Sequence, residues 1–119
     1  MRPQRPFRWG VFQADLNPTK GSEQQGVCPV LVISDEDFNE AMPIVTVLPL
    51  TSREANRKLY PGEVLVRAGT AGLEVDSIVL AYQVRTISKR RLGELYGYLE
   101  EPSLRQKVKG TLMEHLGIL

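Results

Sequence analysis

VFQADLNPTKGSEQQGVCPVLVI, residues 11–33, decides how the chain begins to fold, because one long polar stretch separates two apolar segments. Residues 11–16 and 30–33 are the apolar segments, and residues 17–26 are all polar or turn-forming. Residues 30–33 are apolar at every position, which predicts a strand buried on both faces. A polar loop held between two strands is a place for a functional site rather than for a core.

Working outward, runs of apolar and β-branched residues predict more strands. The expected strands are residues 9–16 with Phe12, Ala14 and Leu16 on one face, 29–33, 44–48 ended by Pro49, 63–66, 77–87 and 95–99. Residues 35–39 are expected to form a solvated turn, residues 68–72 a turn of small residues, and residues 88–91 a single helical turn.

The C-terminal segment predicts a helix. Pro102 and Ser103 give a start signal, with Ser103 as N-cap, and Gly117 gives a stop signal. Apolar residues recur four apart between them, at Leu104, Val108, Leu112 and Leu116. Many short strands followed by one helix predict a mainly β, α+β fold: a small closed or half-closed antiparallel barrel with a helix packed on it.

Length and composition narrow the functional classes. A chain of 119 residues predicts a single domain spanning residues 1–119 with one core. Its apolar runs are too short to span a membrane, and no apolar segment of signal-peptide length follows the basic N-terminus. The single cysteine excludes an internal disulfide and suits a reducing cytoplasm. One histidine and one cysteine, far apart, predict no zinc site, and we expect no metal or cofactor.

The net charge of +1 hides an uneven distribution. Residues 21–43 contain acidic side chains and no Lys or Arg, whereas residues 84–91 contain Arg85, Lys89, Arg90 and Arg91 and no acid. The first eight residues add Arg2, Arg5 and Arg8. A fold that brings the two basic segments together would attract phosphate; otherwise these are ordinary solvated charges.

Several polar residues are candidates for chemistry, and each has a plainer alternative. Glu23 is a candidate general base or a solvated loop residue. Thr51 and Ser52 follow a buried strand, where hydroxyls bind phosphate oxygens or cap a turn. Gln83 and Arg85 share a face of the expected strand, and Arg85 suits bidentate phosphate binding, although a surface arginine is the alternative.

Other residues are expected to be structural. His115 lies one position off the apolar stripe of the helix and is interpreted as a surface or interface residue. Trp9, Tyr96 and Tyr98 are interpreted as core or interface residues. Cys28, at the start of the second strand, is interpreted as a small buried or edge thiol with no base to activate it.

Taken together and in this order, six motifs resemble the MazF/PemK toxins of type II toxin–antitoxin pairs. They are DLNPTKGSEQ (15–24), PVLVIS (29–34), VLPLTS (47–52), YPGEV (60–64), DSIVLAYQVRTI (76–87) and KRRLG (89–93). The resemblance runs from about residue 8 to residue 116, and the combination is far more specific than any one motif.

The resemblance implies the SH3-like barrel that these toxins share with the CcdB gyrase poisons, and a homodimer bound by a cognate antitoxin. It also implies a cytoplasmic, metal-independent endoribonuclease that cuts single-stranded RNA, chiefly mRNA, at a short sequence and so inhibits translation and growth. In the family, the ribose 2′-hydroxyl attacks the adjacent phosphorus and leaves a 2′,3′-cyclic phosphate and a 5′-hydroxyl.

By position in the motifs, the resemblance implies that Glu23 faces the substrate, that Thr51 lies near the scissile phosphate and that Gln83 lines the same groove. Ser22, Gln24, Ser52 and Arg85 are the further RNA-binding candidates.

The chain departs from the family at the end of the loop. The family usually has Gly, any residue, Arg and Pro there, and this chain has Gly26-Val27-Cys28-Pro29. A thiol cannot replace the donors of the catalytic arginine, and losing one such contact costs roughly 10²–10³ in rate. Further departures are Arg8-Trp9-Gly10, where Arg-Gly-Glu or Arg-Gly-Asp is usual, and Tyr82, where an Asp usually precedes the Gln.

Two hypotheses account for Cys28. In the first, Cys28 is an inactivating substitution rather than the native residue. One base change converts an arginine codon into a cysteine codon, and a toxin gene cloned without its antitoxin selects for loss of activity. Alternatively, the chain is a natural variant in which Arg85 or an N-terminal arginine supplies the charge.

Two other functional classes remain open. One is an inactive module that binds antitoxin and RNA without turnover. The other is a CcdB-like gyrase poison, which relies on a C-terminal tryptophan, whereas the single tryptophan here is Trp9.

Overall fold

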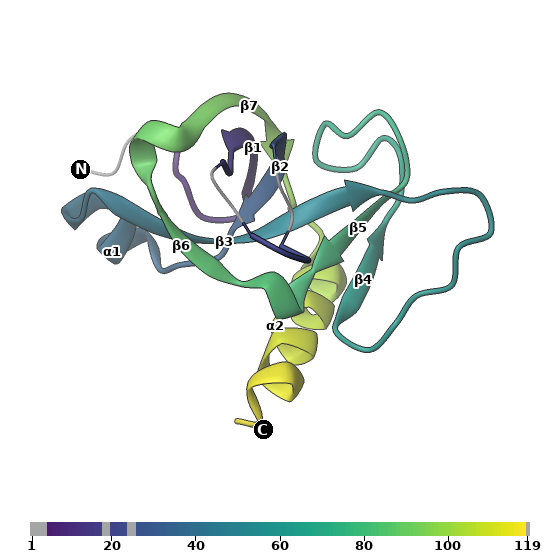
Figure 1. The fold of residues 1–119 in the computed structure, drawn as a ribbon. Coiled ribbons are helices and arrows are strands. Elements are labelled where there is room, and N and C mark those ends of the chain that lie inside the picture. The colour runs from purple at the N-terminus through teal and green to yellow at the C-terminus, as the bar shows by residue number, and fades with distance from the viewer. Residues whose placement is uncertain (1–4, 18–19, 24–25, 119) are drawn as a thin grey trace.

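The polar loop lies between two paired strands, as its flanks predict. In the computed structural model, which describes residues 5–17, 20–23 and 26–118, β1 pairs antiparallel with β2 (Figure 1). The strands are β1 (Gly10–Asp15), β2 (Val27–Val32), β3 (Ile44–Ser52), β4 (Glu63–Val66), β5 (Ser77–Leu80), β6 (Arg85–Ser88) and β7 (Leu92–Tyr98). The helices are α1 (Glu36–Ala41) and α2 (Pro102–Leu116), with 3₁₀ turns η1 (Ala81–Gln83) and η2 (Lys89–Arg91).

All described strand pairs are antiparallel, in the order β4-β5-β3-β2-β1-β7, with β6 also paired to β3. The mainly β fold with a C-terminal helix is confirmed. Within the described residues, however, the two end strands, β4 and β7, do not pair with each other. The sheet therefore stays open and is barrel-like only in a loose sense. None of the described helices is long and apolar enough to cross a membrane.

Successive side chains of β1 point to opposite faces of the sheet and enter two separate apolar clusters. Val11 joins a cluster with Leu31, Leu48 and Val108, whereas Phe12 and Ala14 join a second cluster. The helix α2 lies against the first cluster through Val108, with Leu104 and Leu112 packed beside it. The sheet is therefore buried on both faces, and Figure 1 shows α2 extending away from it toward the C-terminus.

The structure corrects the expected turn at residues 35–39. This segment begins helix α1, with Asp35 as N-cap accepting a hydrogen bond from the Asp37 amide. Glu36 is buried and accepts hydrogen bonds from the amides of Phe7 and Arg8, which fastens the N-terminal segment to the helix. The charged residues predicted a solvated turn because the backbone amides that bind Glu36 lie about 28 residues away in the chain.

The expected end of the third strand at Pro49 is also wrong. The strand β3 continues through Pro49 to Ser52. Pro49 pairs in register with Val30 of β2, and the next residue, Leu50, pairs with Val79 of β5. Proline has no N–H to donate, and it fits here because β3 exchanges one neighbour for another at this position.

The long strand expected at residues 77–87 is two strands separated by η1. β3 pairs with both, Leu50 with Val79 and Val47 with Arg85, so η1 inserts extra residues into the register. The expected sharing of strand faces across residues 82–85 therefore does not hold. The 3₁₀ turn instead directs residues 82–85 toward a cavity.

At the C-terminus the expected helix and its end are confirmed, with Gly117 in the left-handed conformation at φ 69°. The expected N-cap is wrong by two residues. Glu101 occupies that position, and the Ser103 hydroxyl donates to its carboxylate at 2.7 Å. The single turn at residues 88–91 is confirmed as η2, capped by the Ser88 side chain.

Candidate functional site

A cavity of about 510 Å³ lies between the β1–β2 loop and the segment that joins β5 to β6. It is lined by Ser22, Glu23 and residues 82–85. We call it the Arg85 cavity. Ser22, Glu23, Gln83 and Arg85, which the sequence marked as site candidates, are thus brought together from segments about sixty residues apart.

The loop presents Glu23 through a tight turn. The Glu23 amide donates to the Lys20 carbonyl at 3.3 Å, and the Lys20 amide donates to the Glu23 carboxylate at 3.3 Å. Gly21, at φ 62°, allows this turn because the left-handed region disfavours larger residues. Gln24, another candidate of this loop, lies outside the described residues.

The loop also contacts the opposite wall of the cavity. Gln83 Nε2 donates a hydrogen bond to the Ser22 carbonyl at 3.3 Å. This contact joins η1 to the loop across the mouth of the Arg85 cavity. Gln83 therefore positions the loop in this structure, as well as lining the cavity.

Arg85 is the cation of the cavity. Its Nη1 atom is buried and has no hydrogen-bond partner among the described residues. Arg85 as a whole is half-buried, and the accessible part of its guanidinium at the cavity wall can bind a phosphate oxygen. The cavity therefore suits an anion placed against Arg85.

The stem of the loop is fastened by Arg91 of η2. Arg91 Nη1 donates to the carbonyl of Asp15 at 3.0 Å and also to the carbonyl of Asn17. Across the stem, the Leu16 amide donates to the Gly26 carbonyl at 3.0 Å and the Gly26 amide donates to Asn17 Oδ1 at 3.1 Å. The sequence marked Arg91 only as part of a basic segment, and no local pattern signals this bracing role.

Thr51 and Ser52 lie elsewhere. They line a second cavity of about 280 Å³, together with Pro29, Ser77 and Tyr96 among others. We call it the Thr51 cavity. Neither hydroxyl lines the Arg85 cavity, so the residues expected in a single groove line two separate cavities in this structure.

Cys28 lies close to the Thr51 cavity but does not line it. The side chain is 8% exposed and packs with Ala14 and Val30 in the second apolar cluster, as expected for a small buried thiol. Burial raises the pKa of Tyr96, and the nearby Glu94 and Cys28 raise it further. Pro29, the next residue of β2, lines the Thr51 cavity, so position 28 lies at the edge of this cavity while its thiol packs in the second cluster.

Tyr82 belongs to a network that the sequence did not reveal. Its hydroxyl donates to Glu63 Oε2 at 2.7 Å, and Arg57 donates to both Glu63 oxygens at 2.9 and 3.1 Å. The hydrogen bond from Arg57 lowers the pKa of Glu63 to about 2, against the opposing effect of burial. Burial and the bond to Glu63 raise the pKa of Tyr82 to about 12. The one sequence signal was the departure at Tyr82 from the family's usual Asp.

The two basic segments touch at one described contact, which the charge distribution alone left open. Lys89 Nζ lies 5.0 Å from the centroid of the Phe7 ring, which places η2 beside the N-terminal segment. Arg8 forms an ion pair with Asp35, with 3.9 Å between Arg8 Nη1 and Asp35 Oδ1. Arg2 lies outside the described residues.

Trp9 and His115 fit their structural interpretations. Trp9 is buried in the first cluster, with the Arg8 and Arg105 guanidinium groups over its ring. His115 is exposed, and its ring lies edge to face near Tyr82. In the part of the chain that the structure describes, no three His, Cys, Asp or Glu side chains gather as metal ligands.

The comparisons with known proteins agree with this fold. Residues 7–116 match the family described as PemK-like, MazF-like toxin of type II toxin–antitoxin system. An endoribonuclease MazF of Staphylococcus saprophyticus is 36% identical over 99 residues, which cover 83% of this chain and 82% of that protein.

Solved structures give the same result. A MazF crystal structure from Deinococcus radiodurans has a TM-score of 0.79 at 28% identity and covers 97% of this chain and 99% of its own. A MazE–MazF crystal structure from the same organism has a TM-score of 0.73 at 25% identity and covers 98% of this chain and all (100%) of its own. The family match spans nearly the whole chain, and this chain therefore belongs to the PemK-like, MazF-like toxins of type II toxin–antitoxin systems.

Proposed function

We propose that this chain is a metal-independent endoribonuclease that cuts single-stranded RNA at a short sequence. The proposal rests on the family, on the endoribonuclease MazF relative and on the chemistry of the Arg85 cavity. The observation that carries it is that Arg85 and Glu23 line the same cavity. A carboxylate can accept the proton of the attacking hydroxyl, and a cation can stabilise the charge that develops on the phosphoryl oxygens.

The proposed reaction is an internal transfer at phosphorus. The ribose 2′-oxygen forms a bond to the adjacent phosphorus, and the bond from phosphorus to the 5′-oxygen breaks. The 2′ proton passes to a general base, and the leaving 5′-oxygen takes up one proton from a general acid, so that no proton is gained or lost overall. The products are a 2′,3′-cyclic phosphate and a 5′-hydroxyl, and neither a metal nor water enters the step.

In this proposal each residue has a defined role. Glu23 accepts the 2′ proton, and Arg85 stabilises the charge that develops on the phosphoryl oxygens. Thr51 donates its hydroxyl to the RNA from the Thr51 cavity. Ser22, Gln24, Ser52 and Gln83 contribute polar contacts to RNA on either side of the scissile phosphate.

Cys28 weakens this chemistry. The thiol is neutral, short and buried, so it brings no donor to the Thr51 cavity. An arginine at position 28 would add a second cation beside Pro29, a residue that lines the Thr51 cavity. We therefore propose that the natural activity of this chain depends on Arg85 and is low.

The proposed partners are a second copy of the chain and an acidic antitoxin. A MazE–MazF structure is among the similar folds, and its name pairs that toxin with MazE. A disordered acidic segment would cover the basic residues of η2 and the N-terminal segment. The cell compartment in which toxin, antitoxin and mRNA meet is the cytoplasm.

The experiment is cleavage of a long RNA in the presence of EDTA, with the chain as it stands and with Cys28→Arg. We expect slow cleavage that leaves 5′-hydroxyl ends, and a rate about 10²-fold higher for Cys28→Arg. Cleavage without that gain would favour the natural variant, in which Arg85 or an N-terminal arginine supplies the charge. If the chain as it stands and the Cys28→Arg variant both bind RNA but do not cut it, the inactive binding module would be favoured and the proposed function contradicted.

A further inference from the structure

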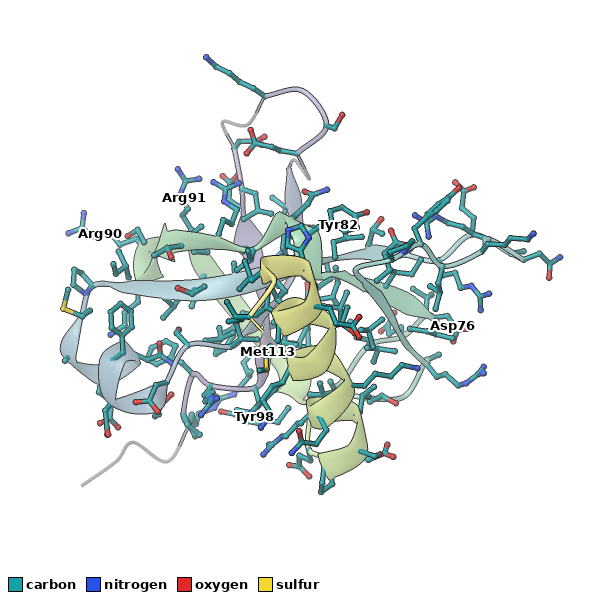
Figure 2. The ribbon with its side chains drawn as sticks, turned by 90° about the horizontal axis from the view of Figure 1, so that it is seen from below. Asp76, Tyr82, Arg90, Arg91, Tyr98 and Met113 are labelled. Atoms are coloured by element: carbon teal, nitrogen blue, oxygen red, sulfur yellow. The ribbon has the colours of Figure 1, made fainter. Side chains whose placement is uncertain are left out.

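We propose that the Tyr82 ring is a stacking site for a nucleobase whose phosphate lies against Arg85, an inference that rests on the proposed function. Tyr82 lines the same cavity as Arg85 and is 38% exposed. Aromatic side chains bind bases of single-stranded RNA by stacking, since every base has a π-face. Figure 2 shows Tyr82 beside the C-terminal end of α2.

The hydroxyl of Tyr82 is committed to the protein interior. It donates to Glu63, whose side chain is 0% exposed and is also bound by Arg57 and by the Tyr60 amide. The end of the ring that carries the hydroxyl therefore lies against a buried carboxylate. With its hydroxyl already bonded, the side chain suits a stacking role more than a hydrogen-bonding one.

Gly62 packs against the ring and helps to fix it. A Cβ atom at Gly62 would lie 2.8 Å from Tyr82 Cδ2, so only glycine permits this approach. The Ala81 amide also donates to the Gly62 carbonyl at 2.9 Å, which ties η1 to the turn before β4. The ring is therefore oriented before any RNA arrives, which lowers the entropy cost of binding.

The Arg85 cavity has room and polar groups for one nucleotide. Its volume of about 510 Å³ lies in the range of small-molecule sites. Arg85 offers a guanidinium for the phosphate, and Gln83 holds the Ser22 carbonyl and so fixes the opposite wall. With Tyr82 as the apolar wall, the cavity has one group for the base and one for the phosphate.

The test is binding of an oligonucleotide that cannot be cut. A 2′-O-methyl RNA lacks the nucleophilic hydroxyl but keeps its bases, and an abasic oligomer of equal length keeps only the phosphates. Fluorescence anisotropy measures the affinity of each for the wild type, Tyr82→Ala, Tyr82→Leu and Tyr82→Phe. We expect Tyr82→Ala and Tyr82→Leu to bind the 2′-O-methyl RNA about 5- to 100-fold more weakly, with less than about twofold change for the abasic oligomer. Tyr82→Phe keeps the ring and should stay within about threefold of the wild type.

Tyr60→Ala is the matched control, because Tyr60 is 61% exposed and does not line the Arg85 cavity. Its affinity for both oligomers should equal that of the wild type, and melting temperatures establish that each variant is folded. Equal losses for both oligomers in Tyr82→Leu, or no loss for either, would overturn stacking while leaving the proposed function intact. A wild-type chain that binds neither oligomer would overturn both.

Discussion

Glu63 shows how much one residue holds in place. Its carboxylate accepts hydrogen bonds from Arg57, the Tyr60 amide and the Tyr82 hydroxyl, and so joins the loop after β3 to the wall of the Arg85 cavity. These contacts lower the Glu63 pKa from 4.5 to about 2. A carboxyl group whose pKa is lower in the folded than in the unfolded state stabilises the fold above its unfolded pKa.

The stability of the chain should therefore fall in acid because of Glu63. The contribution is fully present above about pH 4.5 and is lost as the pH falls toward about 2. The shift corresponds to on the order of 3 kcal/mol. Urea denaturation from pH 6 to pH 2 should show a shallower loss of unfolding free energy in Glu63→Gln than in the wild type. Glu54→Gln, on the exposed part of the same loop, should follow the wild type. Parallel pH curves for Glu63→Gln and the wild type would contradict this assignment.

At the scale of elements, the β1–β2 loop depends on η2. Arg91 donates to two carbonyls in the loop stem, and the stem closes through the bonds between residues 16–17 and Gly26. The loop carries Ser22 and Glu23 to the cavity wall, where Gln83 meets it. The geometry of the site is thus set partly by a residue that does not line it.

Arg91→Ala should loosen this stem. The Gly26 amide should exchange its hydrogen roughly 10- to 150-fold faster, since the loss of a hydrogen bond to a charged donor costs roughly 1.5–3 kcal/mol. Hydrogen exchange followed by NMR or mass spectrometry measures the change. Arg90→Ala removes an equal charge from a neighbouring exposed residue and should leave the exchange unchanged. Figure 2 shows both arginines on one side of the molecule. Equal effects of the two variants would indicate a charge effect rather than bracing.

The sequence predicted most strands and the terminal helix, because their apolar patterns depend on neighbours in the chain. It failed where distant partners decide. Pro49 continues a strand because β3 changes neighbours there, and residues 36–41 form a helix whose buried Glu36 binds the N-terminal backbone. The same holds for the site. Family motifs brought out Glu23 and Arg85, but the separation of the two cavities and the Tyr82 network depend on tertiary packing.

At the scale of the whole molecule, α2 covers one face of the open sheet. Val108 is the buried contact of this helix with the first apolar cluster. Leu104 and Leu112 are partly buried beside it, and these apolar contacts, centred on Val108, hold the helix against the sheet.

Val108→Ala should destabilise the fold by roughly 1–3 kcal/mol, since it removes two buried methyl groups and leaves a cavity. Chemical denaturation measures the loss, with Lys107→Ala as the exposed control on the same helix. The control should change the unfolding free energy by less than about 0.5 kcal/mol. Equal small changes in both variants would mean that the helix is not docked through Val108.

The central claim is that RNA is cut in the Arg85 cavity. Its most direct test is the single-turnover cleavage rate of a long RNA in EDTA for Glu23→Gln, Arg85→Ala and Arg90→Ala, in the natural chain and in Cys28→Arg. Glu23 and Arg85 line the cavity, whereas Arg90 is an exposed arginine of the same segment. We predict that Glu23→Gln and Arg85→Ala each lower the rate by about 10²–10³ and that Arg90→Ala changes it by less than about threefold. Cleavage that survives Glu23→Gln and Arg85→Ala unchanged would contradict the account.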